Sequence, residues 1–119
     1  MLWVHRKGAM PADEGLAGIC PGSMGTLSFH VEGRGNADAL RSSAHGAGRA
    51  MSRDAARRRF SARELARQME GVWFDPRAAH RLRDESPRAY KDVRTVLRAQ
   101  HELVRITRTL RPLLIYKGS

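Results

Sequence analysis

The chain has 119 residues and a formal net charge of +10, with 22 lysine and arginine residues against 12 aspartate and glutamate residues. That length suits one domain or part of one, and a hydrophobic fraction of 41% is too high for a disordered chain. No apolar run approaches the roughly 18 residues of a membrane span, and the polar N-terminus lacks a signal-peptide core. A single cysteine, Cys20, excludes an internal disulfide framework and a cysteine-rich zinc module. We therefore expect a cytoplasmic protein without a membrane partner.

Composition divides the chain into two halves. Residues 1–51 contain nine of the eleven glycines, whereas residues 52–119 carry seventeen basic against eight acidic residues. Most of the basic residues are arginines, whose planar guanidinium groups match phosphate oxygens. We expect an α+β fold, with strands and Gly-rich loops in 1–51, a mainly helical 52–110 and a final short strand. An anionic partner such as nucleic acid and a set of solvated helix faces both account for the arginines.

Two strands are predicted in the first half. Residues 2–7 form the first. Residues 26–32 form the second, because apolar residues alternate strictly with polar ones and so occupy one face. Residues 33–36 then make a turn.

Serine N-caps predict two short helices in the second half. One begins after Ser52, and the other begins after Ser61, where Glu64 three residues later completes a capping box. Apolar residues at helical spacing predict the longest helix over roughly 88–108. Two short strands are also expected, at residues 72–74 and 113–116.

Residues 45–49, His-Gly-Ala-Gly-Arg, are the first candidate site. The glycines let the backbone approach a ligand and turn its N–H groups inward. The N-terminus of the helix expected after Ser52 favours an anion, and Arg49 adds a phosphate-binding fork. A histidine at the head of such a loop can attack phosphorus as a nucleophile. The alternative is a Gly-rich turn with an exposed histidine.

Two weaker candidates lie in the first half. Residues 21–28 form a tight loop that leads into a strand, and the hydroxyls of Ser23 and Ser28 suit the polar edges of a nucleotide. A plain β-turn is the alternative. The imidazole of His5 can bind a metal ion, and the alternative is a histidine that is merely packed or exposed.

Six segments, taken in order, resemble the C-terminal part of the RtcB family of RNA-splicing ligases. The resemblance covers nearly the whole chain. It implies that residues 1–119 are a C-terminal fragment of a single RtcB-like ligase domain. The matching segments are residues 4–9, 21–26, 32–36, 45–53, 89–93 and 117–118.

The resemblance implies a GTP- and manganese-dependent RNA ligase. Such an enzyme joins 2′,3′-cyclic phosphate or 3′-phosphate RNA ends to 5′-hydroxyl ends, in tRNA splicing and RNA repair, through a guanylylated histidine. His45 matches that histidine, and His5 matches a manganese ligand. Other positions match residues that bind or lie beside the guanylate: Arg6, Pro21, Gly22, Ser23, Met24, Ser28, Gly46, Ala47, Gly48, Arg49, Tyr90 and Lys117.

Several parts of the family's site have no counterpart in this sequence. In the family an Asp, a Cys, further His ligands and an Asn that contacts the GMP phosphate come from an N-terminal part. We therefore expect the isolated chain to be inactive in ligation and a complementary N-terminal chain to be a partner beside RNA. Two alternatives are a non-catalytic basic RNA-binding module and a degenerate, truncated remnant.

Overall fold

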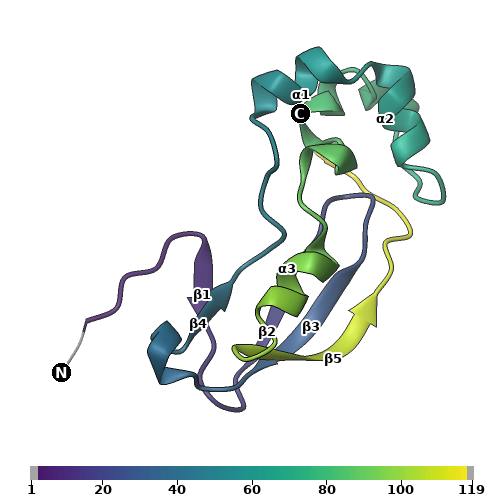
Figure 1. The fold of residues 1–119 in the computed structure, drawn as a ribbon. Coiled ribbons are helices and arrows are strands. Elements are labelled where there is room, and N and C mark those ends of the chain that lie inside the picture. Colours follow the sequence, from purple (N-terminus) through teal and green to yellow (C-terminus); the bar gives the residue numbers. More distant parts are fainter. Residues whose placement is uncertain (1–2, 118–119) are drawn as a thin grey trace.

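Two lobes make up the elongated molecule in the computed structural model, which describes residues 3–117. The longest dimension is 50 Å and the other two are 27 and 25 Å. One lobe contains the strands and one helix, and the other contains two helices and several 3-10 turns (Figure 1). This mixture agrees with the predicted α+β class. None of the helices within residues 3–117 has the length and apolarity needed to cross a membrane.

Two antiparallel sheets form the strand-rich lobe. The larger contains β2 (Ala17–Cys20), β3 (Ser28–Gly33) and β5 (Val104–Leu110) in the order β2-β3-β5. The smaller pairs β1 (Ala9–Pro11) with β4 (Ser42–Ala44). Strand β3 is therefore central, and β5 is an edge strand of the larger sheet.

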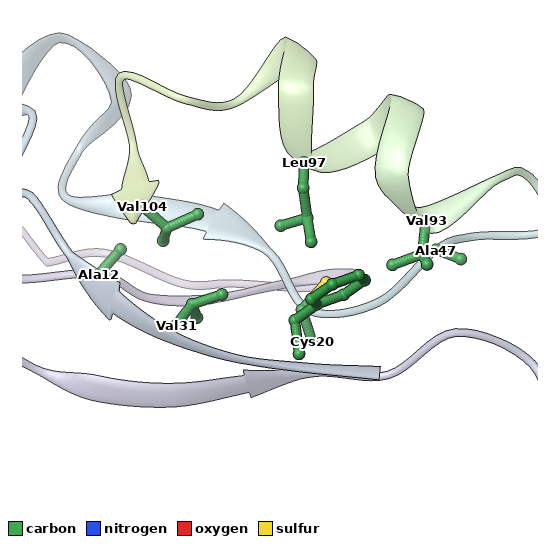
Figure 2. Close-up of a cluster of buried hydrophobic side chains, with 8 residues drawn as sticks. Ala12, Cys20, Val31, Ala47, Val93, Leu97 and Val104 are labelled. Carbon is green, nitrogen blue, oxygen red and sulfur yellow. The ribbon is translucent and has the colours of Figure 1, made fainter. Parts of the chain in front are cut away.

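The alternating pattern of β3 buries its apolar side chains, as the sequence predicted. Phe29 and Val31 are both buried, and α3 (Val93–Ala99) covers them with Leu97 among the residues of the same cluster (Figure 2). Full burial of such a side chain stabilises the fold by about 1.5–3 kcal/mol. This cluster is the core of the strand-rich lobe.

Capped helices form the other lobe, as predicted. The hydroxyl of Ser52 accepts a backbone hydrogen bond at the start of α1 (Arg53–Arg59). Ser61 and Glu64 form both hydrogen bonds of a capping box at the start of α2 (Ala62–Gln68). Such a cap contributes about 0.5–2 kcal/mol to helix stability, which matters because each helix has only seven residues.

The two lobes share a loop. Met24, in the connection between β2 and β3, is buried in the second lobe with Leu65 and Met69 of the α2 region. A separate small cluster packs Phe60 behind α1. The loop of the second candidate site is thus anchored by its own methionine. Three 3-10 turns complete this lobe: η2 (Pro76–Ala78), η3 (Arg81–Glu85) and η4 (Pro87–Ala89).

The prediction of one long helix over residues 88–108 is wrong. Helix α3 ends at Ala99, and residues from Val104 onward pair with β3 as strand β5. The expectation of a mainly helical 52–110 therefore fails for its last seven residues. This segment is rich in β-branched residues, which favour an extended strand on a half-buried sheet. Its apolar positions match helical spacing only by coincidence.

The three other predicted short strands are also absent as strands. Residues 3–7 have no regular structure, Leu2 lies outside the described residues, and β1 begins only after Gly8, whose φ is +72°. Residues 72–74 and 113–116 do lie side by side, but they form a single parallel bridge between Trp73 and Leu114.

Candidate functional site

His45 follows β4 and has an exposed side chain. Its backbone N–H points to the carbonyl oxygen of Gly8 at 3.5 Å, which continues the pairing of β4 with β1. Two residues later the N–H of Ala47 donates to the carbonyl oxygen of Pro21 at 3.0 Å. A side chain at Gly46 would place its Cβ only 3.3 Å from that same oxygen. The first and second candidate loops therefore touch, and the imidazole faces solvent beside the contact.

The second half of the loop pairs with residues around Tyr90. Gly48 has a φ of +78°, and its carbonyl oxygen accepts a hydrogen bond from the N–H of Lys91 at 2.8 Å. Arg49 then forms an antiparallel bridge with Tyr90. The start of α1 is already capped by Ser52. The anion-binding prediction therefore rests on the loop itself and not on the helix behind it.

Hydroxyl groups hold the shape of the loop at residues 21–28. The N–H of Gly22 donates to the Ser28 hydroxyl at 3.1 Å, and the N–H of Ser23 donates to the Thr26 hydroxyl at 2.7 Å. At Gly22 an added Cβ would lie 2.4 Å from the carbonyl oxygen of Leu27, so a side chain does not fit. The two serines thus have a structural task here, and their role toward guanylate stays a prediction.

Glu85, which the sequence analysis did not single out, brings together three of the predicted guanylate residues. The Arg49 guanidinium lies 3.3 Å from its carboxylate, and the Lys117 ammonium lies 3.6 Å from it. The Tyr90 hydroxyl donates a hydrogen bond to the same carboxylate. Arg53 adds an ion pair from α1. We call these five residues the Glu85 cluster.

The cluster fixes the protonation states of its members. Burial alone would raise the pKa of Glu85, but hydrogen bonds from Tyr90 and Arg53 and the charge of Lys117 outweigh it and lower this pKa from 4.5 to about 2. Burial and the hydrogen bond to Glu85 raise the pKa of Tyr90. At neutral pH the cluster therefore contains an ionised carboxylate and a neutral tyrosine that acts as its donor. The Arg49 guanidinium also lies over the Tyr90 ring, 4.7 Å from its centroid.

His5 and Arg6 lie on the irregular N-terminal segment, and both are exposed. The Arg6 guanidinium donates to the Ser42 hydroxyl at 2.7 Å, which ties this segment to β4. Within residues 3–117 no three His, Cys, Asp or Glu side chains come together as a metal site. Cys20 is buried, and its burial raises the pKa of the thiol.

A cavity of about 550 Å³ lies beside Tyr90, with Thr26, Lys91 and Arg111 among its lining residues. His45 is not among them. The predicted site residues thus fall into three groups in this structure. The His45 loop contacts the loop at residues 21–28, the Glu85 cluster gathers a second set, and the N-terminal segment carries the third.

Comparison with known proteins identifies a family. The model of the family described as "tRNA-splicing ligase RtcB" matches residues 1–118. The RNA-splicing ligase RtcB of Escherichia coli K12 is 44% identical over 117 residues, which cover 98% of this chain and 28% of that protein. The tRNA-splicing ligase RtcB of Nanoarchaeum equitans is 38% identical over 136 residues, again 98% of this chain and 28% of the relative. The RNA-splicing ligase RtcB of Mycobacterium tuberculosis is 36% identical over 132 residues, 97% of this chain and 31% of the relative. The chain therefore spans less than a third of the length of these relatives.

Proposed function

Because the chain belongs to the RtcB family, we propose that it carries the nucleophilic histidine and part of the guanylate pocket of an RNA ligase. The ligase would join 2′,3′-cyclic phosphate or 3′-phosphate ends of RNA to 5′-hydroxyl ends, with GTP as the source of the guanylate. In this proposal residues 1–119 form the C-terminal part of an RtcB-like domain. A complementary N-terminal chain or segment supplies the remainder of the site.

The observation that carries the proposal is the position of His45 within a chain of this family. Its imidazole is exposed, and its loop is held by backbone hydrogen bonds from His45 to Gly8 and from Ala47 to Pro21. An accessible imidazole on a fixed backbone suits nucleophilic attack. In this role a His45 nitrogen attacks the α-phosphorus of GTP, a phosphorus–nitrogen bond forms and pyrophosphate leaves.

The Glu85 cluster holds three side chains of the proposed guanylate pocket in place before a ligand binds. Arg49, Tyr90 and Lys117 come from three distant parts of the chain, and each contacts the one carboxylate of Glu85. Side chains held in place before binding lose less conformational entropy when a ligand arrives. Glu85 is thus a positioning residue for the guanylate pocket in this proposal.

Manganese does not fit residues 3–117 alone. His5 is the one metal ligand that we propose in this chain. Within residues 3–117 no cluster of three or more His, Cys, Asp or Glu side chains forms around it. Manganese takes oxygen and imidazole ligands from several side chains. A complete site therefore needs ligands that residues 3–117 do not supply.

A chimeric ligase tests the proposal. Residues 1–119 replace the matching part of the E. coli K12 relative, and the product is assayed for joining of a 3′-phosphate RNA to a 5′-hydroxyl RNA with GTP and manganese. We expect the chimera to join the ends and His45→Ala to reduce the rate by at least about 10³-fold, as expected for loss of a nucleophile. His80→Ala is the matched control, because His80 is exposed in the second lobe and carries no proposed role.

Two results would contradict the proposal. Joining by His45→Ala at the rate of the parent chimera would remove His45 from the reaction. A folded chimera without joining activity would show that residues 1–119 cannot perform the function of the segment that they replace. The isolated chain is expected to show no joining, since the relatives are more than three times its length.

A further inference from the structure

A basic groove of about 380 Å³ lies between α3 and the edge strand β5. Its floor is apolar and includes Leu97 and the half-exposed Ile106. No carboxylate occurs among the described residues that line it. Five basic side chains lie along it: Arg34, Arg94, Arg98, His101 and Arg105.

Three of these arginines have no acidic partner within residues 3–117. Arg34, Arg94 and Arg98 form no ion pair there, whereas Arg105 pairs with Glu32 at 3.1 Å. Arg94 and Arg98 are also four residues apart on α3, a spacing at which like charges repel by about 0.2–0.5 kcal/mol. An anion in the groove would relieve this repulsion.

Only α3 separates the groove from the His45 loop. The N–H of Ala44 donates to the Gln100 side chain at 2.7 Å, and Ala47 packs beside Val93 in the core cluster (Figure 2). In Figure 1 the connection from β4 to α1 runs on one side of α3, and β5 lies on the other. The groove is on the β5 side, because residues of α3 and β5 line it. A helix with its side chains is about 10–12 Å across, so a polyanion bound in the groove would have one helix to pass on its way to the His45 loop.

We propose that this groove binds the phosphodiester backbone of single-stranded RNA next to the end that is to be joined. The inference rests on the proposed function for the identity of the polyanion. The unpaired guanidinium groups match phosphate oxygens, and the apolar floor accepts sugars and base edges. A charged groove that follows the backbone of a single strand binds without regard to sequence.

Binding of a fluorescent single-stranded RNA with a 3′-phosphate, followed by anisotropy, tests the groove. The test variant is the double substitution Arg94→Gln and Arg98→Gln in the full chain. Arg63→Gln with Arg67→Gln is the matched control, because these exposed arginines have the same spacing on α2 and do not line the groove. Glutamine keeps a helix propensity close to that of arginine. Both doubles therefore lose the same charge from a helix of the same length.

We expect the groove variant alone to lose affinity. Each phosphate contact of a single strand contributes about 0.7 to the slope of log affinity against log salt. Loss of two contacts should lower that slope by about 1.4 and weaken binding about 25-fold at 0.1 M salt. The control should change binding by less than about threefold.

Three outcomes would overturn the inference. Equal weakening by both doubles would show that net charge and not the groove attracts RNA. Unchanged binding by the groove variant would place the RNA elsewhere. A dimer that the groove variant dissociates without any change in RNA affinity would assign the groove to a second copy of the chain. None of these results bears on His45, whose part in the reaction is tested by the chimera.

Discussion

Two sets of arginines, one in each lobe, have opposite surroundings. In the helical lobe Arg49 and Arg53 pair with Glu85, and Arg53 and Arg57 pair with Asp84. Both carboxylates are largely buried, with 15% and 13% of their side-chain surfaces exposed. These arginines are part of the packing of the lobe.

In the strand-rich lobe Arg105 pairs with Glu32, but the other arginines of the basic groove have no such partner. Arg34, Arg94 and Arg98 border the basic groove and have no ion pair within the described chain. A net charge of +10 does not distinguish the two sets. Arginines bound to buried acids already have their charge neutralised within the fold, while unpaired arginines around a groove are available to a polyanion.

Removal of the central carboxylate should have the largest effect on stability. Glu85→Ala leaves the Tyr90 hydroxyl and the Arg49 guanidinium without their shared acceptor. We expect the free energy of unfolding to fall by about 2–3 kcal/mol, measured by urea denaturation. Glu70→Ala is the control, in the exposed turn that follows α2, and should change this free energy by less than about 0.5 kcal/mol. Equal effects of the two substitutions would show that Glu85 contributes no more to stability than an exposed carboxylate does.

Acid should weaken the same cluster. The pKa of Glu85 is about 2 in the folded chain against 4.5 ordinarily, so the folded state favours the ionised form. The stabilisation is therefore present above pH 4.5 and is lost as the pH falls toward 2. Each pKa unit corresponds to about 1.4 kcal/mol, which gives a loss of up to about 3 kcal/mol over this range.

Denaturation midpoints between pH 5 and pH 2 measure this dependence. Glu85→Gln should flatten the profile, because glutamine does not titrate. A Gln variant with the same steep profile as the parent would assign the acid sensitivity to other groups.

The smallest effect is expected in the groove. Arg94→Gln with Arg98→Gln removes no ion pair and relieves one like-charge contact on α3. Thermal unfolding should show stability unchanged or raised by a few tenths of a kcal/mol. A loss above about 1 kcal/mol would mean that these arginines are structural, like those of the Glu85 cluster.

Local signals in the sequence predicted the elements that local interactions determine. The alternation of β3 and the serine caps of α1 and α2 are confirmed. The prediction for residues 104–110 was wrong because the spacing of their apolar residues also fits a helix. In the structure, pairing with β3 makes this segment a strand. That pairing joins residues more than seventy positions apart, which no local pattern reveals.

The candidate site shows the same limit. The resemblance supplied Arg49, Tyr90 and Lys117 as separate residues, and the structure shows that they share Glu85. Glu85 lies five residues before Tyr90 in a stretch of charged residues. Nothing in the sequence distinguishes it from the exposed charged residues nearby, and only the folded structure shows that it is the shared acceptor. The prediction for His45 and the guanylate residues stays open to experiment.

Transfer of label from α-labelled GTP to the chimeric ligase tests the central claim most directly. The account predicts a covalent guanylate on the peptide that contains His45, lost in acid and stable in alkali as expected for a phosphorus–nitrogen bond, and absent from His45→Ala. Label on another residue, or undiminished label on His45→Ala, would contradict the assignment of His45 as the nucleophile.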